Sequence, residues 1–186
     1  MTRYDIAHLP PYDSQSGHLN AIIETPKGSR SKFKYDEKHG LFMFDKALPL
    51  GTTFPFDFGF LPSTIGEDGD PLDVLVLGDE PSFAGCLVLA KLLGVIEAEQ
   101  TDKDETNRND RFIAVPLEVE SRKPARHWPD SLSPAISDAI IEFFVAYNDL
   151  QDKKFNVLRC SSSSRAMELI KQGFAKARRG KKKRRS

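Results

Sequence analysis

The stretch that decides the fold reads Glu67-Asp68-Gly69-Asp70-Pro71-Leu72-Asp73-Val74-Leu75-Val76-Leu77. Its acidic half contains a glycine and a proline, which favour a tight turn over a helix. Its second half is an uninterrupted run of Val and Leu, as in a buried strand. We therefore expect the carboxylates to crowd at the mouth of a buried strand, where a rigid element presents side chains to a ligand.

Carboxylates placed so closely repel one another unless a cation lies between them. Hard dications such as Mg²⁺ prefer oxygen ligands of this kind. The alternative is a solvated acidic surface turn, which needs no partner. The apolar strand that follows, and further acids and bases elsewhere in the chain, favour the metal site. An EF-hand does not fit, because the fifth position counted from Asp68 is Leu72, which offers no side-chain oxygen.

Composition sets the broad class of the protein. A chain of 186 residues is most simply one domain, long enough to bury a core. No apolar run approaches the roughly 20 residues that span a bilayer, and the first residues lack the apolar core of a signal peptide. Cys86 and Cys160 are too few for a disulfide framework. We expect a reduced, cytoplasmic protein with no membrane span.

The net charge of zero hides an uneven distribution. Residues 176–186 hold eight basic side chains and no acid, which leaves 19 basic and 27 acidic residues in the rest of the chain. We therefore expect a single domain over residues 1–178 and a basic, disordered tail over residues 179–186. The tail would bind polyanions weakly, or it would serve only for solubility.

Hydrophobic periodicity predicts many short strands followed by two helices. Strands are expected at residues 19–25, 32–36, 41–44, 74–77, 87–96 and 112–115, an irregular aromatic wall at 53–61, and a polar hairpin or loop at 101–110. Helices are expected at residues 134–150 and 164–177, with Ser133 as the N-cap of the first. This order indicates an α+β domain built on a small barrel.

The chemistry-bearing residues form a coherent set. Lys34, Lys46 and Arg111 lie at the edges of predicted strands, and Tyr147 lies on the first helix. Each cation alone is most simply a solvated surface charge. Together with the acidic groups they are the parts that metal-assisted phosphoryl chemistry requires, in which metals screen phosphate charge and cations hold the leaving phosphate.

Several motifs resemble the soluble family I inorganic pyrophosphatases. The most specific is Asp68-Gly69-Asp70-Pro71-Leu72-Asp73-Val74-Leu75-Val76, and the resemblance covers roughly residues 18–178. The flanking motifs occur in the family's order: Ile23-Glu24-Thr25-Pro26, Lys34-Tyr35, Pro55-x-x-x-Gly59-Phe60, Ala114-Val115-Pro116 and Phe143-Phe144-x-x-Tyr147-x-Asp149-Leu150.

The resemblance implies a five-stranded OB-like β-barrel with two main helices packed outside. It also implies hydrolysis of pyrophosphate to two phosphates, with several Mg²⁺ ions per site and Mn²⁺ as a substitute, in a homo-oligomer that is often a hexamer. Asp70 then resembles the carboxylate that orients and deprotonates the attacking water. The implied metal ligands are Glu24, Asp68, Asp70, Asp73 and Asp102, with Asp104 as the alternative to Asp102. The implied phosphate contacts are Lys34, Lys46, Arg111 and Tyr147.

The chain departs from the family pattern at the phosphate side. Lys46 stands at a usual Arg, Phe58 at a usual Tyr, and Asn148 at a usual Lys. Asn109 aligns with a usual metal-binding Asp, unless the loop shifts by one residue and Asp110 takes that place. The alternatives are therefore a catalytically weakened member that binds metal and phosphate, and a nucleic-acid-binding barrel suggested by the basic tail and the aromatic content.

Overall fold

The structure, a computed structural model, describes residues 6–118 and 131–183. A short 3-10 helix, η1, precedes the sheet. The strands are β1 (Leu19–Thr25), β2 (Ser31–Asp36), β3 (Leu41–Ala47), β4 (Asp57–Leu61), β5 (Leu72–Val76), β6 (Leu87–Asp102), β7 (Glu105–Arg108), β8 (Arg111–Pro116) and β9 (Lys153–Ser162), and the helices are η1 (Ile6–His8), α1 (Pro134–Asp149) and α2 (Ser163–Lys183).

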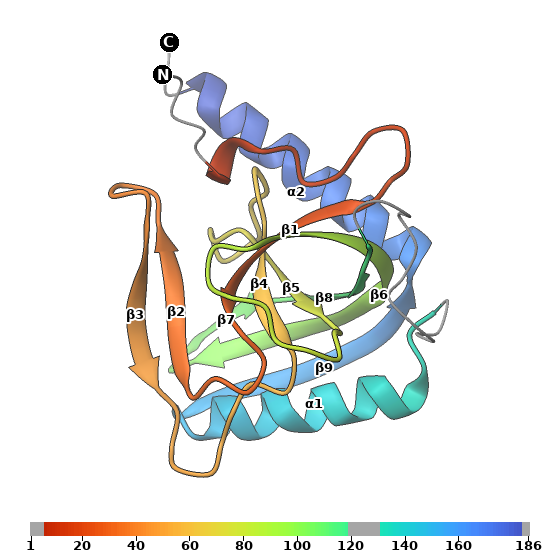
Figure 1. Ribbon diagram of the computed structural model, residues 1–186. Coiled ribbons are helices and arrows are strands. Elements are labelled where there is room, and N and C mark those ends of the chain that lie inside the picture. Colours follow the sequence, from red (N-terminus) through yellow and green to blue (C-terminus); the bar gives the residue numbers. More distant parts are fainter. Residues whose placement is uncertain (1–5, 119–130, 184–186) are drawn as a thin grey trace.

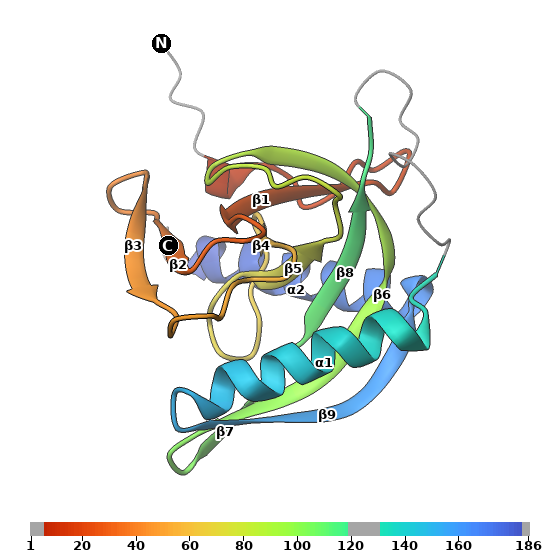
Figure 2. The same ribbon diagram turned by 60° about the horizontal axis from the view of Figure 1, so that its bottom comes forward.

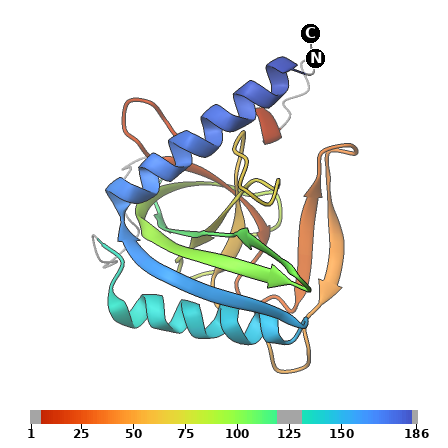
Figure 3. The same ribbon diagram turned by 180° about the vertical axis from the view of Figure 1, so that it is seen from behind.

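Five strands close into a barrel in the order β1-β4-β5-β8-β6, and β6 pairs again with β1. The β5–β8 pair is parallel, and the other pairs of the ring are antiparallel. Helices α1 and α2 lie on opposite sides of this barrel (Figures 1 and 3). The predicted fold class, a small five-stranded barrel with two helices outside, is confirmed.

Strand β6 is the longest of the described strands and extends beyond the barrel. Strands β7 and β9 both pair with its second half (Figure 2). The end of β6 and strand β7 together form the polar hairpin predicted from the sequence. A Cβ at Gly94 would lie 2.5 Å from the Ser161 carbonyl oxygen, so glycine is required at this position, where β9 pairs closely with β6. Strand β9 has no counterpart among the strands predicted from the sequence.

The expectation of an irregular wall over residues 53–61 is wrong for its second half, which forms β4. A glycine inside a strand normally argues against that strand. Here Gly59 is required, because a Cβ would lie 1.9 Å from the Ile22 carbonyl oxygen of β1. Both faces of β4 are buried, so it shows no polar alternation.

Strand β5 is buried on both faces, which fixes the position of the acidic segment before it. Its Leu75 belongs to an apolar cluster that includes Ile140 and Phe144 of α1. Its Val74 belongs to a second cluster that includes Ile170 of α2. Alternate residues of β5 therefore belong to two apolar clusters, one shared with each helix.

The helix boundaries differ from the sequence analysis mainly at the C-terminus. α1 begins as predicted, with the Ser133 hydroxyl accepting a hydrogen bond from the Ile136 amide at 3.4 Å. α2 continues to Lys183, so residues 179–183, which we expected to be disordered, are helical. Residues 184–186 lie outside the described part of the chain. Neither helix is long and apolar enough to cross a membrane, within the residues the structure describes.

Candidate active site

A cavity of about 410 Å³, here called the central cavity, opens between the barrel, the β2–β3 hairpin and α1. The acidic loop (residues 62–71, between β4 and β5) forms part of its wall. Nine residues singled out from the sequence line it together: Glu24, Lys34, Lys46, Asp68, Asp70, Asp73, Asp102, Arg111 and Tyr147. Asp104 is absent from its lining, so the structure places Asp102 at the cavity in preference to Asp104.

Glu24 is the most deeply buried carboxylate of the central cavity, with 8% of its surface exposed. Its Oε1 accepts a hydrogen bond of 2.7 Å from the Tyr35 amide. Burial raises the pKa of Glu24 to about 7, and the charge of Asp73 adds to the rise, while the amide of Tyr35 and the charges of Lys32 and Lys34 oppose it. The protein alone therefore supplies too little positive charge to hold this group fully ionised at neutral pH.

Asp68 and Asp73 share this environment. Burial raises the pKa of both carboxyls. Arg111 opposes the rise at Asp73 through an ion pair of 2.7 Å between its Nη1 and the Asp73 Oδ2. The charge of Asp70 adds to the rise in the pKa of both Asp68 and Asp73, and the charge of Asp73 adds to the rise at Asp68, as expected for like charges held in one place.

Asp70 is exposed, with 68% of its side-chain surface accessible. Gly69 before it has a φ of 91°, in the left-handed region that favours glycine. The Asp70 Oδ2 lies 3.5 Å from the Lys34 Nζ. Burial lowers the pKa of Lys34, but the charges of Asp70 and Glu24 outweigh it and leave that pKa raised.

Two buried donors on the basic side lack hydrogen-bond partners among the described residues. These are the Nε of Arg111 and the hydroxyl of Tyr147. The Arg111 guanidinium lies 4.7 Å from the centre of the Phe144 ring and donates from Nη1 to Asp73 and Asn109. Buried donors without partners are costly, and a bound oxyanion would satisfy them.

The structure adds cavity residues that the sequence analysis missed. The Lys32 Nζ lies 5.7 Å from the centre of the Tyr147 ring. Lys32 could have been predicted from the sequence, because it lies two residues before Lys34 on one strand and so shares its face. Lys153 pairs with Asp102 at 2.7 Å, and Gln151 accepts a hydrogen bond from Lys46. Lys153 begins β9 and Gln151 lies two residues before it, in a region for which the sequence offered no signal.

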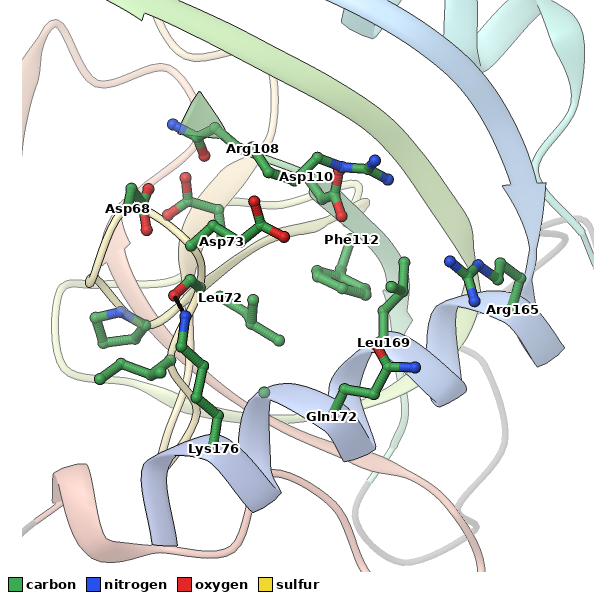
Figure 4. A pocket seen from close by; sticks show the side chains of 16 residues that line it. Asp68, Leu72, Asp73, Arg108, Asp110, Phe112, Arg165, Leu169, Gln172 and Lys176 are labelled. Carbon is green, nitrogen blue, oxygen red and sulfur yellow. Dashed lines mark hydrogen bonds and ion pairs between the residues drawn. The ribbon is translucent and has the colours of Figure 1, made fainter. Parts of the chain in front are cut away.

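The loop does not shift to bring Asp110 into the central cavity. Asn109 lines that cavity and donates from Nδ2 to the Gln100 Oε1 at 3.2 Å. Asp110 instead accepts hydrogen bonds from the Ala98 amide at 3.0 Å and the Arg108 Nε at 2.5 Å. It lines a separate cavity, drawn in Figure 4.

The donor set of the central cavity fits a hard dication. Within residues 6–118 and 131–183, no three Asp, Glu, His or Cys side chains converge into a ready-made metal cluster. The carboxylates lie around the cavity instead, and burial raises the pKa of Glu24, Asp68 and Asp73, so a bound cation would stabilise their charged forms. All of the acidic donors are oxygens, the type that Mg²⁺ and Mn²⁺ prefer.

Comparisons with known proteins point to one family. The profile of the family described as Inorganic pyrophosphatase matches residues 21–178. A relative named inorganic pyrophosphatase from Synechocystis sp. is 30% identical over 171 residues, 90% of this chain and 96% of that protein. One from Halalkalibacterium halodurans is 36% identical over 158 residues, 85% of this chain and 94% of that protein. The crystal structure of inorganic pyrophosphatase from Thermus thermophilus aligns with a TM-score of 0.80 at 29% identity, covering 94% of this chain and 99% of that one.

Proposed function

This chain belongs to the inorganic pyrophosphatase family, and from that premise we propose that it is a Mg²⁺-dependent diphosphatase that hydrolyses pyrophosphate to two phosphates. The observation that carries the proposal is the central cavity. It unites an excess of carboxylate charge on one side with lysines, an arginine and unpartnered buried donors on the other. A phosphoanhydride needs both sides, because its negative charge must be screened before a nucleophile approaches.

Asp68, Asp70, Asp73, Asp102 and Glu24 would hold the cations, with Mn²⁺ as a possible substitute for Mg²⁺. When bound, such ions neutralise phosphate charge and lower the pKa of a coordinated water. Asp70 supplies the base in this proposal. Its exposed carboxylate would accept the proton of the attacking water, and its Oδ2 lies 3.5 Å from the Lys34 Nζ.

The basic side would bind the substrate. Lys34, Lys46 and Arg111 would contact phosphate oxygens as cations, and Tyr147 would donate its buried hydroxyl. The Arg111 guanidinium is held against the Phe144 ring and by Asp73, so it is in place before substrate arrives. The unpartnered hydroxyl of Tyr147 supports a contact that forms only with ligand.

A second candidate is a family member that binds metal and phosphate without efficient turnover. Two observations favour it. Asn109 occupies the cavity where a carboxylate is usual, and its side-chain oxygen is taken up by Arg111. Asn148, at a usual Lys, is buried and donates back to the Phe144 carbonyl at 2.8 Å, so it brings no cation.

Phosphate release from pyrophosphate separates the two candidates. We expect Mg²⁺-dependent release that EDTA abolishes, with Mn²⁺ tested in parallel. Asp70→Asn should lower the rate by about 10²–10⁴-fold through loss of the general base. Asp79→Asn is the matched control, because Asp79 is an exposed carboxylate outside the central cavity. Release no faster than that of Asp70→Asn would favour the second candidate.

The remaining proposals concern the oligomeric state of the protein and its location in the cell. We propose a homo-oligomer, such as a hexamer, in the cytoplasm. Exposed apolar side chains on β3 support an interface there: Leu41 (63% exposed), Met43 (51%) and Phe44 (59%). Light scattering should give a multiple of 20.9 kDa, and a monomer would contradict the proposal.

The basic end, residues 179–186, would bind polyanions weakly outside the single domain of residues 1–178. Binding of inorganic polyphosphate that weakens with salt and is lost when residues 179–186 are deleted would support this. Binding that survives the deletion would place the polyanion contact elsewhere.

A further inference from the structure

The acidic loop has open space on both sides. On one side lies the central cavity, and on the other lies a cavity of about 300 Å³ between the loop and α2, here called the rear cavity (Figure 4). Asp68, Asp73 and Asn109 line both cavities. A segment flanked by cavities lacks the close packing that holds core residues in place, so its position depends on a few specific contacts.

Helix α2 supplies two of these contacts. The Ile65 amide donates to the Gly173 carbonyl at 3.2 Å. The Lys176 Nζ donates to the Gly66 carbonyl at 2.6 Å, and Figure 4 shows this side chain reaching from the helix to the loop. The helix approaches the loop closely at Gly173, where a Cβ would lie 2.9 Å from the Leu72 Cδ1 and 3.3 Å from the Ile65 carbonyl oxygen.

The anchored residue is linked in turn to the candidate ligands. The Gly66 amide donates to the Asp70 carbonyl at 2.8 Å, which closes the loop on itself. The Asp70 amide donates to the Asp68 Oδ1 at 3.1 Å, which orients that carboxylate. Gly66 is therefore linked to both aspartates through hydrogen bonds of 2.8 Å and 3.1 Å.

We propose that Lys176 is a positioning residue that braces the acidic loop from α2 and so holds Asp68 and Asp70 in the geometry that Mg²⁺ requires. The effect of the brace on catalysis rests on the proposed function, in which Mg²⁺ held by these aspartates supports pyrophosphate hydrolysis. Lys176 itself is outside the lining of the central cavity, so it acts through the Gly66 carbonyl. Site residues need such support, because small displacements of catalytic groups are costly.

Three variants test the brace. Lys176→Met keeps the aliphatic stem and removes the donor, and Lys176→Arg retains a donor at nearly the same reach. Lys171→Met is the matched control: Lys171 is exposed on the same helix and lines neither cavity, and five residues turn it about 140° from Lys176. Two measurements are made on the full chain. One is the Mg²⁺ concentration that half-maximally raises the melting temperature without substrate, and the other is kcat and KM as a function of Mg²⁺.

For Lys176→Met we expect the Mg²⁺ midpoint to rise about fivefold, the change that corresponds to one lost hydrogen bond, and kcat to fall at limiting Mg²⁺. Lys176→Arg should restore most of both, and Lys171→Met should match the wild type. An unchanged Mg²⁺ midpoint in Lys176→Met overturns the brace, even if its melting temperature without Mg²⁺ falls. An equal rise in Lys171→Met also overturns it, by assigning the effect to net charge. If the wild type releases no phosphate, the proposed function fails, while the midpoints still decide the brace.

Discussion

Two buried glutamates of the barrel, Glu97 on β6 and Glu24 on β1, have opposite electrostatic environments. Glu97 is fully buried and accepts hydrogen bonds from the Arg159 Nε at 2.8 Å and the Ser161 hydroxyl at 2.6 Å, and it also pairs with Arg108. The hydrogen bonds from Arg159, with those of Ser161 and Arg108, lower the pKa of Glu97 to about 2 against the cost of burial. Its charge is balanced by the chain itself.

Glu24 is nearly as buried but receives one backbone hydrogen bond, from Tyr35, and forms no ion pair among the described residues. Burial raises its pKa to about 7. The same side chain at similar burial is thus driven in opposite directions, because cations bond directly to Glu97 and not to Glu24. The charge of Glu97 therefore stabilises the fold, whereas the charge of Glu24 is left for a ligand to balance.

The largest expected effect concerns Glu97, whose charge the chain itself balances. Glu97→Gln should lower the free energy of unfolding by about 3 kcal/mol, because it removes the carboxylate that accepts charge-assisted hydrogen bonds from Arg108 and Arg159. Urea denaturation measures the loss, and activity per folded molecule should stay within about twofold. Glu99→Gln, on the same strand, should change stability by less than about 0.5 kcal/mol. A loss in Glu97→Gln as small as in this control would break the comparison.

The two glutamates should also give opposite pH slopes in the metal-free protein. Glu97 has a folded pKa below its ordinary 4.5, so its stabilisation is full above pH 4.5 and is lost as the pH falls toward 2. Glu24 has a folded pKa above 4.5, so stability falls as the pH rises from 4.5 to about 7, by up to about 3 kcal/mol. Denaturation across this range, repeated with Glu24→Gln, measures the second slope. A slope that persists in the variant would assign it to other groups.

The next effect is smaller and concerns Glu24, the glutamate of the central cavity. Glu24→Gln at pH 7 should raise the stability of the metal-free protein by about 1 kcal/mol, because a neutral amide avoids the cost of the buried charge. The same variant should need about tenfold more Mg²⁺ for half-maximal activity. Thermal melts without metal and rates over a Mg²⁺ series test the two statements. A variant that is less stable and unchanged in Mg²⁺ demand would make Glu24 a structural residue.

The smallest expected effect concerns the phosphate side. Lys46→Arg should lower the KM for pyrophosphate about threefold, because a guanidinium can bind a phosphate with two parallel hydrogen bonds. Initial rates over a substrate series measure it, with Lys171→Arg as control. A raised KM would mean that the hydrogen bond from Lys46 to Gln151 matters more than bidentate binding.

The sequence predicted the barrel because its central strands are apolar runs bounded by turns, as Val74–Leu77 shows. It failed at β4, since Gly59 weakens the strand pattern and only the close approach to Ile22 explains the glycine. It failed at β9 because residues 153–162 alternate weakly, with Phe155 buried among mostly exposed neighbours. That strand is stabilised by pairing with β6, which local periodicity does not reveal.

The site was predictable where chemistry concentrates along the chain. The acidic loop and Lys34 carried their own signals, and all nine predicted site residues line one cavity, while their roles remain predictions. Lys153 could not be found, because it reaches Asp102 only through the β6–β9 pairing. The sequence also could not decide whether Asn109 or Asp110 lines the central cavity. That choice depends on the hydrogen bond from Arg108 to Asp110.

The most direct test of the account is a calorimetric titration of Mg²⁺ into the metal-free protein at pH 7, in two buffers of different ionisation enthalpy. The account predicts saturable binding with release of protons, because a cation favours the charged form of Glu24, whose pKa is about 7. Glu97→Gln should keep that release, and Glu24→Gln should lose it. Absence of Mg²⁺ binding, or proton release that is the same in Glu24→Gln as in the wild type, would contradict the account.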